Sequence, residues 1–177
     1  ALQGRHWATL APEGVHDRLS NAQQMLLMAA GANDDEAAFL ARQVRLHCSL
    51  ELCDPAGGDG ELDAMTHIAA RSMQPFLIWH AAGMRAMRTM LTGRVAEAER
   101  QARQAVGALG HADQVEYMVE HAQMVAIRWS QGRLDELLPR IRDHDHRYPY
   151  IPRWRDSLVA AEVGDVGAAR AEIERHA

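Results

Sequence analysis

The sequence predicts an all-α protein built from antiparallel helical hairpins that stack side by side. Apolar residues recur three or four positions apart over most of the chain, as they do on the buried face of an amphipathic helix. No stretch shows the sustained alternation of apolar and polar residues that is typical of a strand. Short glycine turns recur between the helical stretches, at Gly93, Gly132 and Gly164. A turn that recurs between helices indicates stacked hairpins.

Composition narrows the classes of function. The chain has 177 residues, of which 47% are hydrophobic and 24% charged, as in an ordinary soluble globular protein. This length suffices for one domain, or for several helical repeats that share a continuous core. The net charge of −5 gives no electrostatic attraction to nucleic acid. We therefore expect no direct nucleic-acid binding.

The cysteines, the length of the apolar runs and the ends of the chain each give a further expectation. Cys48 and Cys53 are too few for a disulfide framework, so we expect free thiols in a reducing cytoplasm. The longest apolar run is far shorter than a membrane span, and no charged-then-apolar leader opens the chain. The sequence starts at Ala1 and ends within an apparent helix. We therefore expect residues 1–177 to be a single helical repeat domain, taken from a longer cytoplasmic protein that makes no membrane contact.

The first two helices are predicted over residues 15–30 and 34–52. In the first, Leu19, Ala22 and Leu26 fall on one face. The second begins with acidic residues, which can cap the N-terminus of a helix and interact favourably with the positive end of its dipole.

The next segment contains the clearest predicted loop, residues 54–60, with one proline and three glycines. A helix is predicted over 61–73, and Pro75 then starts another that runs to Thr92, because proline fits the first turn of a helix. This helix is apolar around most of its girth. That pattern is typical of a helix packed between neighbours.

The second half completes the hairpins and brings the total to about nine helices. Helices are predicted over 95–109, 114–131, 134–144, 154–163 and 166–177, and Pro139 is expected to kink the third of these. The turns near Cys53, Gly93, Gly132 and Gly164 lie about 40, 39 and 32 residues apart. Periods in this range are typical of helical-hairpin solenoids.

Three segments, residues 85–100, 131–139 and 148–155, resemble tetratricopeptide-like (TPR-like) repeats. More narrowly, they are similar to the repeat region that follows the ATPase module in large actinobacterial regulators, namely LuxR-type ATP-binding transcriptional regulators and related cyclase-linked ATPases. The resemblance implies a right-handed solenoid with a role in signalling or transcriptional regulation. It carries no catalytic residues, because the repeat motif is a packing motif.

The match to the repeat pattern rests on small residues and turns. The matching residues are Gly93, Ala98, Ala105, Gly132, Pro149, Gly164 and Ala169. Three features depart from the pattern. Cys53 stands where the second turn would have glycine, Leu137 and His144 replace small residues, and the large aromatic of each first helix is mostly missing.

The candidate binding site combines residues of two helices that are each the first of a pair. In a hairpin solenoid such helices line the concave face. Aromatic, methionine and arginine side chains there suit a peptide or a small acidic or aromatic ligand. An alternative is that Trp79 and the methionines only fill the core between repeats. The candidate residues are Trp79, His80, Met84, Arg88, Tyr117, His121, Met124 and Arg128.

Metal and catalytic motifs are weak. The residues from Asp143 to His146 are zinc-type ligands, but neighbours on a helix point in different directions, so a structural or exposed role is favoured. His47 and Cys48 with Cys53 lack the spacing of a zinc knuckle. The glycines at 57–60 lack the Lys-Ser/Thr of a phosphate loop, and no nucleophile motif occurs. We therefore expect no metal, no cofactor and no enzymatic activity.

Three functions follow, in order of preference. The first is a non-catalytic regulatory and protein-interaction domain of a bacterial signalling or transcriptional regulator. Its concave face would recognise a protein partner, a neighbouring domain of the parent chain or an effector. The second is a small-molecule sensor module with a closed pocket. The third is a metal-dependent enzyme on a helical bundle, which stoichiometric metal at residues 143–146 would favour.

Overall fold

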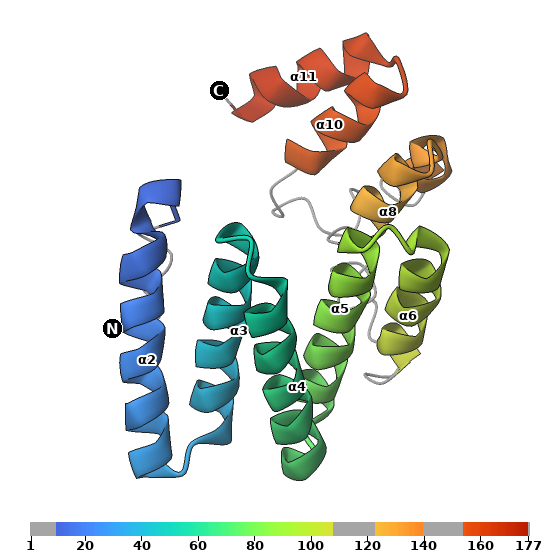
Figure 1. Cartoon of the computed structure of the whole chain (residues 1–177). Helices are drawn as coiled ribbons and strands as arrows, with labels where there is room; N and C mark the ends of the chain where they lie inside the picture. The colour runs from blue at the N-terminus through green and yellow to red at the C-terminus, as the bar shows by residue number, and fades with distance from the viewer. Residues whose placement is uncertain (1–9, 108–122, 140–153, 177) are drawn as a thin grey trace. The chain divides into compact units, whose positions relative to one another are not determined.

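The computed structural model describes residues 10–107, 123–139 and 154–176, and every regular element within these ranges is helical (Figure 1). The predicted all-α class is thus confirmed for the described part of the chain. The chain divides into two compact units, Ala1–Arg85 and Ala86–Ala177. The expected single repeat domain over residues 1–177 stays a prediction.

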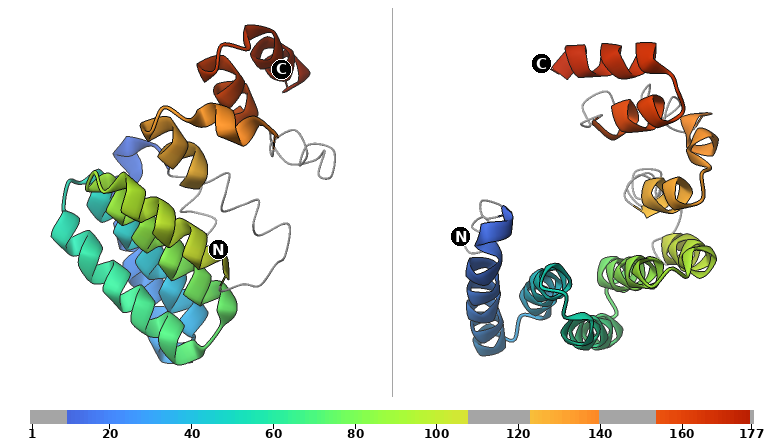
Figure 2. Two further views of the ribbon diagram at one scale, coloured as in Figure 1. Left: turned by 90° about the vertical axis from the view of Figure 1, so that its right-hand side faces the viewer. Right: turned by 45° about the horizontal axis from the view of Figure 1, so that its top comes forward.

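The first unit is a series of helices in which each packs against the next. Figures 1 and 2 show neighbouring helices running in opposite directions. The predicted helices of this unit are confirmed, with one change of boundary given below. Its elements are a short 3₁₀ turn η1 (Pro12–Gly14), α2 (Val15–Ala32), α3 (Asp35–Glu51), α4 (Pro55–Ser72) and the first part of α5 (Pro75–Leu91).

The second unit begins within α5 and continues through shorter helices. In the described ranges the whole chain has eight α-helices, so the predicted total of about nine is neither reached nor contradicted. The helix predicted from Leu134 opens as a 3₁₀ turn, and the described part of the one predicted over 114–131 becomes α-helical at Val125. The elements are α6 (Val95–Gly107), α8 (Val125–Ser130), η3 (Leu134–Leu137), α10 (Trp154–Glu162) and α11 (Val166–His176).

The predicted loop at residues 54–60 is wrong, because α4 already begins at Pro55. The Asp54 side chain caps the helix by accepting a hydrogen bond from the Gly57 amide at 2.9 Å. Gly58 then lies against α3, where an added Cβ would stand 3.4 Å from Leu46 and Leu50 side chains. Close packing of the two helices therefore offsets the low helix propensity of these glycines.

The connections between the helices from α2 to α6 recur every 20 residues. Asn33, Cys53, Met73 and Gly93 all have a positive φ, of 53°, 57°, 54° and 81°. Such left-handed residues end helices because they turn the chain and let its amides reach the last free carbonyls. The prediction that Cys53 stands at a glycine-type turn position is confirmed.

An aspartate follows Asn33, Cys53 and Gly164, the last with a φ of 87°, and starts the next helix. The Asp34, Asp54 and Asp165 carboxylates each accept a hydrogen bond from the amide three residues on, at 2.9, 2.9 and 3.0 Å. A left-handed residue plus a capping aspartate thus ends one helix and begins another within two residues. Connections this short place successive helices side by side.

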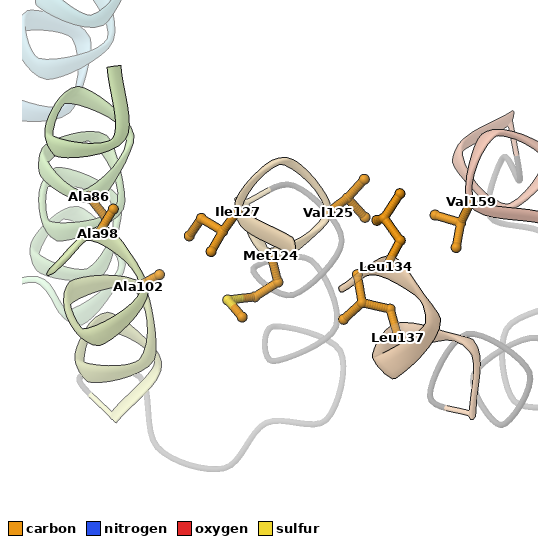
Figure 3. Close-up of a cluster of buried hydrophobic side chains, with 9 residues drawn as sticks. All are labelled: Ala86, Ala98, Ala102, Met124, Val125, Ile127, Leu134, Leu137 and Val159. Carbon is orange, nitrogen blue, oxygen red and sulfur yellow. The ribbon is translucent and has the colours of Figure 1, made fainter. Parts of the chain in front are cut away.

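Each unit has its own apolar core. In the first unit, α3, α4 and the start of α5 share fully buried side chains, among them Phe39, Leu46, Met65 and Leu77. In the second unit, buried side chains of the α8 segment, η3 and α10 form one cluster with small residues of α5 and α6 (Figure 3). The buried residues drawn there are Ala86, Ala98, Ala102, Met124, Val125, Ile127, Leu134, Leu137 and Val159.

Candidate functional site

The predicted site residues on α5 form an aromatic group in the first unit. Trp79, His80 and Met84 are each half-buried. The Trp79 ring lies 5.5 Å from Phe76 and 5.6 Å from His80, measured between ring centroids. The His80 ring also lies 5.5 Å from Phe39 of α3. Met84 packs against the core of this unit.

Polar atoms of this aromatic group lie out of contact with solvent. Trp79 Nε1 and His80 Nδ1 are buried and make no hydrogen bond in the described part of the chain. Burial lowers the pKa of His80 below its ordinary value, and the nearby charge of His47 lowers it further. His80 is therefore held in its neutral form near neutral pH.

The remaining predicted residues belong to the second unit or lie outside the described ranges. Arg88 is half-buried on α5. Met124 and Arg128 are each only 4% exposed, and Met124 belongs to the apolar core of Figure 3. These two positions are those of packing residues. Tyr117 and His121 lie outside the described residues.

Arg128 joins α8 to α6 through a shared carboxylate. Its two terminal nitrogens donate to the Glu99 oxygens at 2.7 and 2.8 Å, and Gln131 donates to the same carboxylate at 2.9 Å. Hydrogen bonds from Arg128, Gln131 and Arg103 lower the pKa of Glu99 to about 2, despite its partial burial. This arrangement holds two helices together.

A cleft in the first unit is the hollow that sequence reasoning missed. It lies across α2, α3 and α4 and has a volume of about 480 Å³. The side chains that line it are Leu26, Ala29, Ala30, Asn33, Asp34, Asp35, Ala38, Arg42, Ala64, His67, Ile68 and Arg71. We call this hollow the α2–α4 cleft.

Small side chains create the α2–α4 cleft. Ala29 and Ala30 line it from α2, Ala38 from α3 and Ala64 from α4. Where helices meet through alanine, no long side chain fills the space between them. These alanines are visible in the sequence. Their convergence depends on how each helix is rotated about its axis, which residues far apart in sequence decide.

The charges around the cleft are balanced within the protein. Arg71 of α4 pairs with Asp35 of α3. Arg42 and Arg45 of α3 both pair with Glu61 of α4, at 2.9 and 2.6 Å. The lining of the cleft is thus half apolar and half polar, and three of its charged residues, Asp35, Arg42 and Arg71, are paired within the protein.

A hydrogen bond connects α2 to the same ion pairs. Arg45 donates to Gln23 of α2 at 2.8 Å, so one arginine of α3 contacts both neighbouring helices. Glu61 is only 8% exposed. Burying a charged carboxylate is costly unless partners of opposite charge offset the loss of water, and the two arginines do so here. The walls of the cleft are thereby held at a fixed spacing.

Metal-type residues do not gather in the described ranges. No group of three or more His, Cys, Asp or Glu side chains there could hold a metal ion. Cys48 is buried, whereas Cys53 is exposed, and both are free thiols. The cluster from Asp143 to His146 lies outside the described residues.

None of the described helices is long and apolar enough to cross a lipid bilayer. Comparison of the whole chain with protein families, characterised proteins and solved structures finds no match.

Proposed function

We propose that this chain is a non-catalytic, regulatory protein-interaction domain that recognises a segment of a partner protein. The observation that carries the proposal is the α2–α4 cleft. Half of its lining residues are apolar, most of them alanines, and Asp35, Arg42 and Arg71 are already paired within the protein. Such a surface suits apolar side chains of a peptide or helix rather than a strongly charged ligand.

We extend the proposal to the whole repeat array. The hairpins are proposed to continue as a right-handed, TPR-like solenoid, in a cytoplasmic actinobacterial regulator of signalling or transcription. The recurring left-handed turns support this, because they repeat one connection at a regular spacing. Trp79, His80 and Met84 of the first unit stay candidates for a second contact region.

The test is selection of binding peptides from a phage-displayed random library, followed by affinity measurements. Ala64→Arg places a long side chain in the cleft from α4. Ala70→Arg makes the same change at an exposed position of α4 that does not line the cleft. We expect selected peptides to bind the parent chain and the Ala70→Arg variant equally, and to lose at least about tenfold in affinity, or about 1.4 kcal/mol, for Ala64→Arg.

Two results would contradict the proposal. One is a failure of the library to yield any specific peptide. The other is equal binding of the selected peptides to both variants, which would place their site elsewhere. Matching melting temperatures of the two variants serve as the control for folding.

A small-molecule sensor is the second candidate function. The cleft volume of about 480 Å³ lies within the range of about 300–1,000 Å³ that is usual for small-molecule sites. A thermal-shift screen against metabolites and nucleotides distinguishes the two functions. A ligand present at about one hundred times its dissociation constant adds roughly 2.7 kcal/mol to the unfolding free energy. A specific shift that Ala64→Arg abolishes would favour the sensor.

A further inference from the structure

The second half of α2 has an unusual composition for a surface helix. Residues 25–32 read Met-Leu-Leu-Met-Ala-Ala-Gly-Ala, which is two full turns without a polar side chain. Residues 20–33 contain no charged side chain at all. A surface helix normally has a polar face opposite its buried face, and a helix that is apolar all round is normally covered.

Part of this apolar surface is nevertheless exposed in the single chain. Leu27 and Met28 are each 67% exposed. Leu26 and Ala30 line the α2–α4 cleft, and Leu27 is about 100° further round the helix from Leu26. A protruding apolar side chain and a hollow that is apolar on its α2 side therefore lie next to each other on one surface.

We propose that this surface is where two copies of the chain associate. The α2 helices of the two copies pack antiparallel about a two-fold axis, and each copy places Leu27 in the α2–α4 cleft of the other. The inference rests on the proposed function, because it takes the cleft to be a surface that recognises protein. It identifies the bound segment as α2 of a second copy.

The self-complementary shape is the first argument for a second copy. In a two-fold interface the same surface is used twice, so that a residue and the hollow receiving it must both belong to that surface. Leu27 and the cleft meet this condition. The small, exposed residues Ala30, Gly31 and Ala32 leave room for two helix backbones to approach closely.

Charge is the second argument. The whole chain has a net charge of −5, so most surfaces of two copies repel each other. Residues 20–33 form a stretch where two copies meet without facing like charges. In the receiving cleft, Asp35, Arg42 and Arg71 are already paired within each copy. The surface is confined to half a helix and one cleft, so we expect a dissociation constant on the order of micromolar.

The experiment is sedimentation velocity of the 177-residue chain over a wide range of concentration. We expect a monomer–dimer equilibrium without larger species. Leu27→Glu introduces a charge into the interface and should leave only monomer. His16→Glu introduces the same charge at an exposed position of α2 outside the uncharged stretch, and should dimerise as the parent does. Unchanged circular dichroism and melting temperature of the monomer show that each variant is folded.

Filling the receiving cleft tests the reciprocal contact. Ala64→Arg should abolish dimerisation, whereas Ala70→Arg should not. Loss of dimer in Leu27→Glu together with an unaffected Ala64→Arg would overturn the proposed geometry. A parent chain that is monomeric at every concentration, or that forms open-ended oligomers, would overturn the two-fold association itself.

The outcomes separate this inference from the proposed function. If the chain is monomeric but library peptides bind the cleft and lose affinity for Ala64→Arg, the proposed function stands and the occupant is another protein. If neither self-association nor peptide binding depends on Ala64, both proposals fail.

Discussion

At the scale of single residues, the left-handed turn positions are occupied by residue types that differ in the free energy needed to adopt a positive φ. Glycine adopts a positive φ freely, and asparagine tolerates it. For most other residues the clash of the Cβ destabilises this conformation by about 1–2 kcal/mol. Met73 has a φ of 54° and its side chain is 74% exposed. The strained φ of Met73 is therefore offset by little burial of its side chain.

Met73→Gly should raise the unfolding free energy by about 0.5–1 kcal/mol, because relief of the strained φ exceeds the greater flexibility of glycine in the unfolded chain. Urea unfolding, with an unchanged dependence on denaturant, measures the effect.

The matched control is Gly93→Ala. Gly93 has a φ of 81°, and an added Cβ would meet nothing within 4 Å, so only the backbone is affected. We expect a loss of about 1 kcal/mol. A stabilising Gly93→Ala or a destabilising Met73→Gly would show that these residues do not hold left-handed turns.

At the scale of elements, helix starts are set by side chains that accept hydrogen bonds from free amides. The Asp54 cap allows α4 to begin at Pro55 despite Gly57, Gly58 and Gly60. Capping and packing thus outweigh the composition that predicts a loop.

Two glycine substitutions in α4 should have opposite effects. In Gly57→Ala the added Cβ would stand 2.1 Å from Asp54 Oδ2, so the cap must move, at a cost of about 1 kcal/mol. In Gly60→Ala the Cβ meets nothing within 4 Å, and better helix propensity should add about 0.5–1 kcal/mol.

Thermal unfolding followed by circular dichroism compares the two variants with the parent. Equal stabilisation by both substitutions would mean that the Asp54 cap contributes nothing to the start of α4.

At the scale of the whole molecule, each unit contains a carboxylate held by two arginines. Glu61 pairs with Arg42 and Arg45 in the first unit, and Glu99 pairs with Arg103 and Arg128 in the second. Such groups join neighbouring helices, α3 to α4 through Glu61 and α6 to α8 through Glu99. Partly buried pairs contribute more than exposed ones, because solvent screens them less.

Glu99→Gln should lower the unfolding free energy at neutral pH by about 1.5–3 kcal/mol, since it removes one of the two carboxylates that pair with the buried Arg128 and leaves only Glu136. Glu97→Gln is the control on the same helix. Glu97 pairs with the exposed Arg94, so its removal should cost less than about 0.5 kcal/mol.

The pH dependence follows from the depressed pKa of Glu99. The pKa falls from 4.5 to about 2 in the folded protein, so the stabilisation is present above pH 4.5 and disappears as the pH falls toward about 2. Urea midpoints measured across this range should fall less steeply in Glu99→Gln than in the parent. A parallel fall in both proteins would contradict the assignment.

The helices and their turns could be predicted from the sequence because they depend on neighbouring residues. Apolar spacing placed α2, α3, α5 and α6 to within a few residues. Cys53 was recognised as a turn residue because it occupies a glycine position of the repeat pattern. Hydrogen bonds that end a helix reach only four or five residues along the chain, so local sequence suffices.

The α2–α4 cleft and the buried ion pairs were decided only by the tertiary structure. Ala30 and Ala64 line one hollow although 34 positions separate them, and Arg128 reaches Glu99 across 29 residues. The start of α4 belongs to the same class, since Gly58 is helical partly because it lies against Leu46 and Leu50. Sequence periodicity shows which face of a helix is apolar. How far that helix is rotated, and which neighbour it meets, follows from the packing of all side chains at once.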